Sequence, residues 1–338
     1  MRLFTSSSEK SFGVWLLSLL SVFLIVGTAL VFYERMWRDK GYVASVQDTK
    51  QFWSVHRALI YSNSKIPLVF LGASRTLYGI DMNWLKRNAP KYAPIMLAVN
   101  GHYPLAILKD LADDERFKGI VMVDVDSRGL RTYHHFMLQS YVDYYHQEFT
   151  PNKWLHHFLL AKLQSKLVFL DQKFSLLNAA KYNLGQAPYP VILNTWMDTQ
   201  RNSGVDLLSV DASALANWFA ELVEEDMRQS PPESAADWLH GLSEVAGWVR
   251  RIESRGGKVI FYAPPVSGRL HELEQHFYPR EQYWDVFLSH YALNGLVTTD
   301  IPLVASIPLP DESHMHFADK EQYTRALFAW ISTHADPF

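Results

Sequence analysis

Short apolar runs alternate with longer amphipathic stretches from residue 66 to the end of the chain. Uninterrupted apolar runs are typical of strands buried on both faces of a parallel sheet, and the stretches between them have helical spacing. The pattern predicts an α/β fold, a three-layer α/β/α sandwich with a mostly parallel sheet. We expect the strands at residues 66–71, 94–99, 119–125, 258–263 and 296–299.

Helices are expected between these strands and after the last one. Pro104 suits the first turn of a helix over 104–113, because proline lacks the amide proton that this turn leaves unpaired. The glycine pair at 256–257 ends a helix that begins near residue 234, and a final helix is expected over 318–334. Residues 130–245 do not follow the strand–helix rhythm and predict a largely helical insertion, a lid or a partner surface.

The N-terminal region carries one uncharged run over residues 12–33, FGVWLLSLLSVFLIVGTALVFY. As a helix it would span roughly 33 Å, which matches the apolar thickness of a bilayer. The run is longer than the core of a signal peptide and lacks a good small-x-small cleavage site, so an uncleaved transmembrane anchor is expected. The predicted organisation is a tail (1–11), an anchor (12–33), a juxtamembrane linker with a helix over 44–61 (34–65), and an α/β domain (66–338).

The basic residues around the anchor do not decide its orientation. Arg2 and Lys10 precede it, and Arg35, Arg38 and Lys40 follow it, so the two sides are nearly balanced. The short tail and the absence of cysteine favour an extracytoplasmic domain. We therefore expect a single-pass inner (cytoplasmic) membrane protein with a periplasmic C-terminal domain.

Composition narrows the classes of function. The net charge of −3 gives no basic field for nucleic acid, and a chain without cysteine has no disulfide, thiolate metal site or cysteine nucleophile. The chain has 11 Trp and 17 Tyr. Most of these should pack in the core, but aromatic faces in a cleft also stack on sugars.

Two short segments carry the chemistry of acyl transfer. The first strand leads into Gly72 and Ala73, small residues that permit a sharp turn, and then Ser74. Near the other end, Asp311 precedes His314 by three residues in a polar loop before the last helix. A serine nucleophile needs a base oriented by a third group, and these residues supply all three.

Each residue also has a simpler interpretation. Ser74 could only cap a helix, and Asp311 with His314 could be an ordinary surface loop. His316 competes with His314 as the base, and these two histidines with Asp311 could hold a metal if further ligands existed.

Further polar residues should lie on the same rim of the sheet. Ser74, Asn100 and Asp126 each follow a predicted strand, and the carboxyl ends of parallel strands share one edge. Arg75 binds a carboxylated sugar or pairs with Asp81 or Asp126.

These segments resemble the SGNH (GDSL-like) hydrolase superfamily over about residues 66–130 and 256–335. Three motifs, LGASRTLYGID, AVNGHYP and LPDESHMHF, are most similar to membrane-anchored or exported members that act on cell-envelope polymers, such as alginate O-acetyltransferases. The resemblance implies a flavodoxin-like sheet, Ser74 as nucleophile, His314 as base and Asp311 as its orienter. It implies an oxyanion donor at Gly101 or Asn100, and no cofactor or metal.

Two departures from the family pattern stand out. Gly-Ala-Ser replaces the usual Gly-Asp-Ser, and VDVDSR stands where Gly-x-Asn-Asp would supply an asparagine donor. That donor is missing or comes from elsewhere, for which Asn100 and Arg75 are the candidates, with Asp126 as a further substrate contact.

The sequence therefore predicts a membrane-anchored serine esterase or O-acyltransferase, of acetyl groups in the first instance, acting on an envelope or exported polysaccharide. The expected partners are the membrane, a carbohydrate polymer or acylated substrate, and a membrane acyl donor or polysaccharide-synthesis protein, without nucleic acid. A catalytically inactive binding subunit of a polysaccharide assembly is the alternative, favoured by the altered third block. A lipid esterase is a third option.

Overall fold

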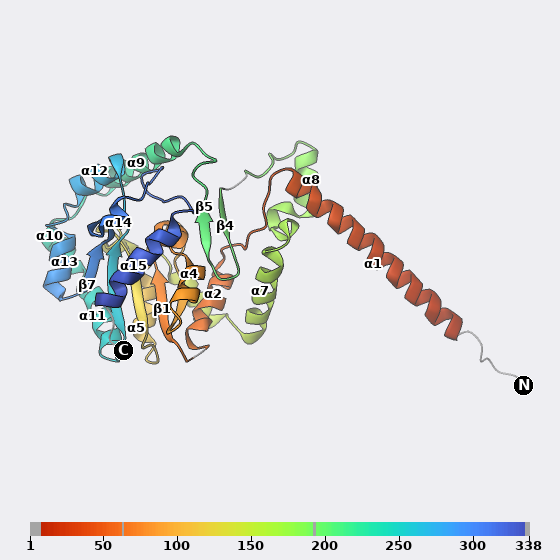
Figure 1. The fold of residues 1–338 in the computed structure, drawn as a ribbon, viewed down its shortest axis with the longest axis horizontal. Helices are drawn as coiled ribbons and strands as arrows, with labels where there is room; N and C mark the ends of the chain where they lie inside the picture. The colour runs from red at the N-terminus through yellow and green to blue at the C-terminus, as the bar shows by residue number, and fades with distance from the viewer. Residues whose placement is uncertain (1–7, 63, 192–193, 335–338) are drawn as a thin grey trace, which may run out of the picture. The chain divides into compact units, whose positions relative to one another are not determined.

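A computed structural model describes residues 8–62, 64–191 and 194–334, and Figure 1 shows the path of the chain. The chain divides into two compact units. The N-terminal unit consists of Met1–Ser45 and Leu163–Ile192, and the main unit of Val46–Lys162 and Leu193–Phe338.

The main unit is built on a five-stranded sheet in which every neighbouring pair is parallel. The strand order is β2-β1-β3-β6-β7, and helices cover both faces, so the predicted α/β/α class is confirmed. The strands are β1 (Ile66–Leu71), β2 (Tyr92–Met96), β3 (Ile120–Asp124), β6 (Lys258–Ala263) and β7 (Asn294–Val297).

The two faces of the sheet bury alternate residues of each strand, as the two-residue period requires. In β1, Val69 and Leu71 point into one apolar cluster, and Leu68 and Phe70 into the other. Because all four are almost fully buried, the strand reads as a continuous apolar run.

Two sets of helices form the outer layers. Residues of α5 (Leu105–Asp113), α10 (Ala235–Gly241), α11 (Ser243–Glu253), α12 (Gly268–Phe277) and α13 (Trp284–Tyr291) join the first cluster. Residues of α3 (Ser74–Gly79), α4 (Met82–Asn88), α7 (Pro151–Gln164), α14 (Pro302–Ala305) and α15 (Lys320–His334) join the second. The main unit also contains α2 (Lys50–Ala58), α6 (Gln139–Gln147) and α9 (Ala212–Gln229), with 3-10 turns at Leu59–Tyr61, Thr132–His134 and Thr298–Asp300. The 3-10 turns Val168–Leu170 and Gln172–Phe174 belong to the N-terminal unit.

The insertion is largely helical but also contains a two-stranded antiparallel sheet, β4 (Thr195–Met197) with β5 (Ser203–Val205). The buried Arg201 holds this hairpin against the rest of the main unit by an ion pair to Asp48 and a 2.7 Å bond to the Ala98 carbonyl. Such short strands depend on tertiary contacts of this kind, and the local pattern does not reveal them.

Several predicted boundaries were wrong, among them that of the last strand, which is Asn294–Val297 and not 296–299. The helix expected from 234 to 255 is two helices, α10 and α11, which break at the poor helix former Gly241 and at Leu242. The helix expected over 44–61 begins only at Lys50, where the Thr49 side chain caps it. The second strand starts earlier than expected, although the amides of Leu97 and Val99 continue to bond along β1.

The N-terminal unit contains α1 (Ser8–Asp39) and α8 (Leu176–Asn183). Within the described part of the chain, α1 is the one helix long and apolar enough to cross a membrane, over Phe12–Asp39. It extends beyond the predicted anchor because Glu34 to Asp39 continue the helix.

Arg57 on α2 is fully buried and forms ion pairs with Asp110, at 2.7 Å, and with Asp114, at 3.0 Å. Removal of one partner from a buried pair leaves an uncompensated charge and typically costs about 3–5 kcal/mol. We expect Arg57→Met to lower the melting temperature of the detergent-solubilised protein by about 5–15 °C. Arg116→Met is the matched control, because the exposed Arg116 also contacts Asp114 and should change the melting temperature little. An equal effect of both substitutions would contradict the buried pair's role.

Candidate active site

The site lies where the strand order changes direction at the carboxyl edge of the sheet. The chain passes from β1 outward to β2 and then returns across β1 to β3. Such a switch point leaves a crevice outside the ends of the two central strands. Ser74 follows β1 and Asp126 follows β3, so both come at the carboxyl ends of the two strands that flank this switch point.

The turn before Ser74 needs a glycine because of a close backbone approach. A Cβ atom at Gly72 would lie 2.6 Å from the Cβ of Asp124, which no side chain tolerates. Ser74 is the first residue of α3, yet neither it nor Ala73 caps the helix by a side-chain hydrogen bond. The serine hydroxyl is therefore not used as a helix cap.

Asp311 builds the C-terminal loop. One carboxylate oxygen accepts hydrogen bonds from the amides of Ser313, at 3.1 Å, and His314, at 2.6 Å. The other oxygen lies 2.8 Å from Nδ1 of His314. The same buried side chain thus closes the turn and orients the imidazole.

The hydrogen-bonded chain continues to the serine. Nε2 of His314 lies 2.8 Å from Oγ of Ser74. Since Nδ1–H donates a hydrogen bond to the Asp311 carboxylate, Nε2 is left as the acceptor for the serine hydroxyl. Ser74, His314 and Asp311, separated by more than half of the chain, therefore form one continuous relay.

The surroundings keep Asp311 ionised and hold the imidazole in place. Burial alone would raise the pKa of Asp311, but the bonds from the His314 ring and from the two loop amides more than offset it, and the pKa lies below its usual value. The rings of Tyr78 and Phe219 flank His314, with centroids 5.9 and 5.5 Å from its own.

A second clamp holds the loop to the helix beside it. Glu312 has a left-handed backbone (φ 62°), a conformation that costs a non-glycine residue about 1 kcal/mol or more. Its carboxylate accepts a 3.0 Å bond from the Leu270 amide on α12, and its carbonyl a 3.0 Å bond from the Ser267 amide. These bonds offset the strain.

Asn100 and Gly101 form the tip of a turn next to the Ser74 loop. The Val99 amide bonds to the Gly72 carbonyl at 3.0 Å, and the His102 amide returns to the Val99 carbonyl at 3.2 Å. Gly101 is the third of the four residues in the β-turn from Val99 to His102. Its φ of 73° is a conformation that favours glycine at this position. Both tip residues are exposed on the rim.

Arg75 and Asp126 are engaged with each other. Their side chains form a 2.6 Å ion pair, and the second oxygen of Asp126 accepts a 2.6 Å bond from the Gly129 amide. Of the two partners expected for Arg75, the structure has Asp126, whereas Asp81 caps α4. Arg75 also approaches Glu274 at 3.5 Å.

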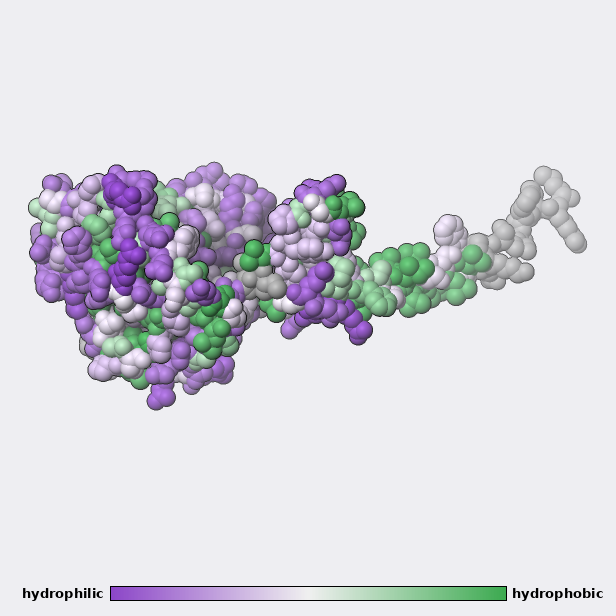
Figure 2. Space-filling view, turned by 90° about the horizontal axis from the view of Figure 1, so that it is seen from above, coloured by the Kyte–Doolittle hydropathy of each residue, from purple (hydrophilic) through white to green (hydrophobic). Residues whose placement is uncertain are grey.

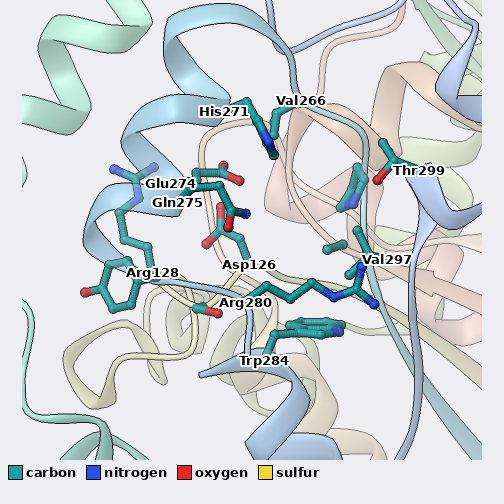
Figure 3. Close-up of a pocket in the computed structure, with 14 residues that line it drawn as sticks. Asp126, Arg128, Val266, His271, Glu274, Gln275, Arg280, Trp284, Val297 and Thr299 are labelled. Carbon is teal, nitrogen blue, oxygen red and sulfur yellow. The ribbon is translucent and has the colours of Figure 1, made fainter. Parts of the chain in front are cut away.

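A cavity of about 80 Å³ opens beyond this ion pair, at the carboxyl ends of β3, β6 and β7. In Figure 3, Asp126 and Glu274 lie next to each other, and Arg280 extends over the ring of Trp284. Burial and the neighbouring Asp126 raise the pKa of Glu274 despite the opposing charge of Arg75. The walls therefore combine carboxylates, guanidinium groups and an aromatic face.

His316 does not compete for the base position. Its Nδ1 accepts a 3.2 Å bond from the Leu207 amide and lies 3.6 Å from Asp206. In the part of the chain that the structure describes, no group of three metal-ligating side chains gathers.

One buried group next to the site was missed by the sequence reasoning. Asp124, at the end of β3, accepts a 2.7 Å bond from the Thr76 hydroxyl, and Thr76 also bonds to Tyr262. Burial raises the pKa of Asp124 to about 6, although Arg75 and Thr76 act in the opposite direction. The sequence could have pointed to Asp124, because this carboxyl lies in the altered VDVDSR segment at a strand position that should face the core.

Fold and site together define an α/β protein with a Ser–His–Asp hydrogen-bonded relay at the edge of its sheet. The sequence matches no protein-family model, and no curated protein matches it. Among solved structures, the chain is similar to one entitled "Crystal Structure of TesA", with 10% identity and a TM-score of 0.37 over 79% of this chain and 98% of that chain.

Asp124→Asn tests the buried carboxyl. The folded state favours protonated Asp124, so the wild type should lose stability relative to the variant as the pH rises from about 4, the unfolded pKa, to about 6, the folded one. The gap should reach up to about 3 kcal/mol and stay constant at higher pH. Melting temperatures from pH 4 to 8 measure it. Glu115→Gln, at an exposed position, is the control, and its melting temperature should change with pH as that of the wild type does. A stability difference between Asp124→Asn and the wild type that does not depend on pH would refute the raised pKa of Asp124.

Proposed function

We propose that the protein is a serine ester hydrolase or O-acyltransferase of the SGNH type. One observation carries this proposal, the relay in which His314 lies 2.8 Å from both Ser74 and Asp311. A buried, ionised aspartate that orients a histidine toward a serine hydroxyl is the arrangement that activates serine for acyl transfer.

The reaction would run in two halves. Ser74 Oγ attacks the acyl carbonyl carbon while its proton passes to Nε2 of His314, and Asp311 stabilises the imidazolium. The tetrahedral intermediate collapses, the ester C–O bond breaks, and His314 protonates the departing alkoxide. Water or an acceptor hydroxyl then attacks the carbonyl carbon of the acyl-serine and gives its proton to His314. The bond between the acyl carbon and Ser74 Oγ breaks, His314 returns the proton to Oγ, and the acid or the new ester leaves.

Negative charge on the tetrahedral oxygen needs donors. The Ser74 amide, at the start of α3, and the exposed tip of the Asn100–Gly101 turn are the groups best located for this role, since the turn is bonded to the Gly72 carbonyl. They would take the place of the asparagine that the altered third block lacks.

We propose a hydroxylated polymer, an envelope or exported polysaccharide, as substrate. The cavity beside Arg75 supports this, because its mixed carboxylate, arginine and tryptophan walls offer donors, acceptors and a stacking face to a sugar ring. We further propose that α1 anchors the chain in the inner membrane with the main unit on the periplasmic side. A chain without cysteine suits that oxidising compartment.

A fluorophosphonate probe tests the proposal directly. The detergent-solubilised full chain should be labelled, and Ser74→Ala and His314→Ala should abolish labelling because they remove the nucleophile and its base. Asp311→Asn should slow labelling by about 10³–10⁴-fold, the effect of losing the orienting carboxylate. Labelling is followed by in-gel fluorescence and intact mass.

Ser313→Ala is the matched control, since it removes another hydroxyl from the same loop as His314 and should label normally. A wild type that is folded, as a cooperative melting transition shows, but stays unlabelled would argue for a binding protein. Label that persists in Ser74→Ala would place the reactive group elsewhere.

Asn100→Ala tests the donor assignment. Loss of one donor to the tetrahedral oxygen typically costs about 10²–10³-fold in rate. We expect a fall of this size in the turnover of a p-nitrophenyl ester, with KM and the melting temperature little changed. Turnover equal to the wild type would assign the role to backbone amides alone.

A further inference from the structure

The C-terminal end of α1 is held by a collar, defined here as residues 163–191 of the same unit. The Tyr33 hydroxyl donates to the Phe174 carbonyl at 2.7 Å, and the Glu34 carboxylate accepts bonds from the amides of Val168 and Phe169 at 3.1 and 3.2 Å. The collar therefore binds α1 where its apolar run ends.

An aromatic cluster joins collar and helix. Trp37 is fully buried, and its ring centroid lies 4.6 Å from Phe174 and 5.6 Å from Tyr42. Tyr182 and Tyr189 of the collar also pack on it. Aromatic rings gather at the boundary between lipid and water, so this cluster has the composition of a membrane interface.

The outer face of α8 is apolar where a helix in water would be polar. Leu176 and Leu177 are 76% and 68% exposed, and Leu184, directly after the helix, is 71% exposed. Helical spacing places these leucines on one side together with the exposed Ala180, and the buried Ala179 faces inward. Lys181 borders this side.

The charge of the region is basic. Residues 34–45 and the collar carry six basic side chains against three acidic ones, and the basic ones are Arg35, Arg38, Lys40, Lys166, Lys173 and Lys181. Figure 2 shows the hydrophobic surface of α1 giving way to polar residues at its end. An apolar strip bordered by basic residues at the end of a membrane-length helix matches the boundary of an anionic bilayer.

We infer that the collar is a membrane-binding element, in which Leu176, Leu177 and Leu184 insert between the lipid headgroups around α1. The inference rests on the proposed anchoring of α1. Continuity selects lipid over a protein partner, since the strip belongs to the unit whose own helix enters the bilayer at that level. The lysines would then contact lipid phosphates.

Site-directed spin labelling tests the inference cleanly, because the chain has no cysteine of its own. Single cysteines at Leu176, Leu177 or Leu184 are labelled with a nitroxide in the full-length protein, reconstituted into vesicles of phosphatidylcholine with one-fifth phosphatidylglycerol. Power saturation compares collisions with oxygen, which concentrates in lipid, and with a water-soluble nickel chelate. We expect a ratio of oxygen to nickel accessibility several-fold above that of the control.

The matched control is Leu208→Cys, since Leu208 is equally exposed, at 79%, but belongs to the main unit. Leu24→Cys, in the middle of α1, reports on the anchor itself. Melting temperatures close to the wild type establish that each labelled variant is folded.

Each outcome decides a separate point. Oxygen-favoured labels on Leu24 and on the three collar positions support the inference. Nickel-favoured collar labels with an oxygen-favoured Leu24 overturn it and leave the anchor intact, whereas a nickel-favoured Leu24 overturns both. Collar labels shielded from both reagents would mean that protein covers the strip, which also overturns it. None of these results bears on the reactivity of Ser74, which the phosphonate probe measures.

Discussion

The geometry of the site depends on the carboxylate of Asp311. Its two oxygens accept bonds from two backbone amides and from the imidazole, so the shape of the loop and the direction of His314 have one cause. An exposed aspartate would exchange these partners with water, but Asp311 is 1% exposed and the exchange is suppressed. The neighbouring Glu312 fixes the loop from outside, by its bonds to the start of α12.

A parallel sheet brings these distant residues together. Ser74 and His314 are 240 residues apart in the sequence. The loops that carry them nevertheless meet at the same edge of the sheet. Residues below this edge pack closely: Gly72 lies against the side chain of Asp124 and leaves no space for a Cβ atom of its own. The hydrogen bonds of Thr76 to Asp124 and Tyr262 then connect the first turn of α3, which begins with Ser74, to the ends of β3 and β6.

Sequence reasoning succeeded where signals are local. β1 and β6 are continuous apolar runs bounded by turn residues, and both lie at the expected positions. Short spacings predicted Ser74, Asp311 and His314 as site residues, and the structure brings the three side chains within hydrogen-bond distance; their catalytic roles stay a prediction. The hairpin β4–β5 escaped prediction because its strands are three residues long and are held by Arg201 through contacts distant in sequence. Phe219 and Glu274 contact the site from helices α9 and α12. They could not be predicted, because the periodicity of a helix shows which side is buried but not which other residues that side meets.

The N-terminal unit is made of two segments that the chain synthesises at different times. Residues 33–42 leave the ribosome before the whole of 46–162, and until the collar follows, Trp37 has only Tyr33 and Tyr42 as aromatic partners and lacks Phe174 and Tyr182. During that interval the end of α1 is an exposed aromatic surface. The unit can therefore close only after residues 46–162 of the main unit have been synthesised.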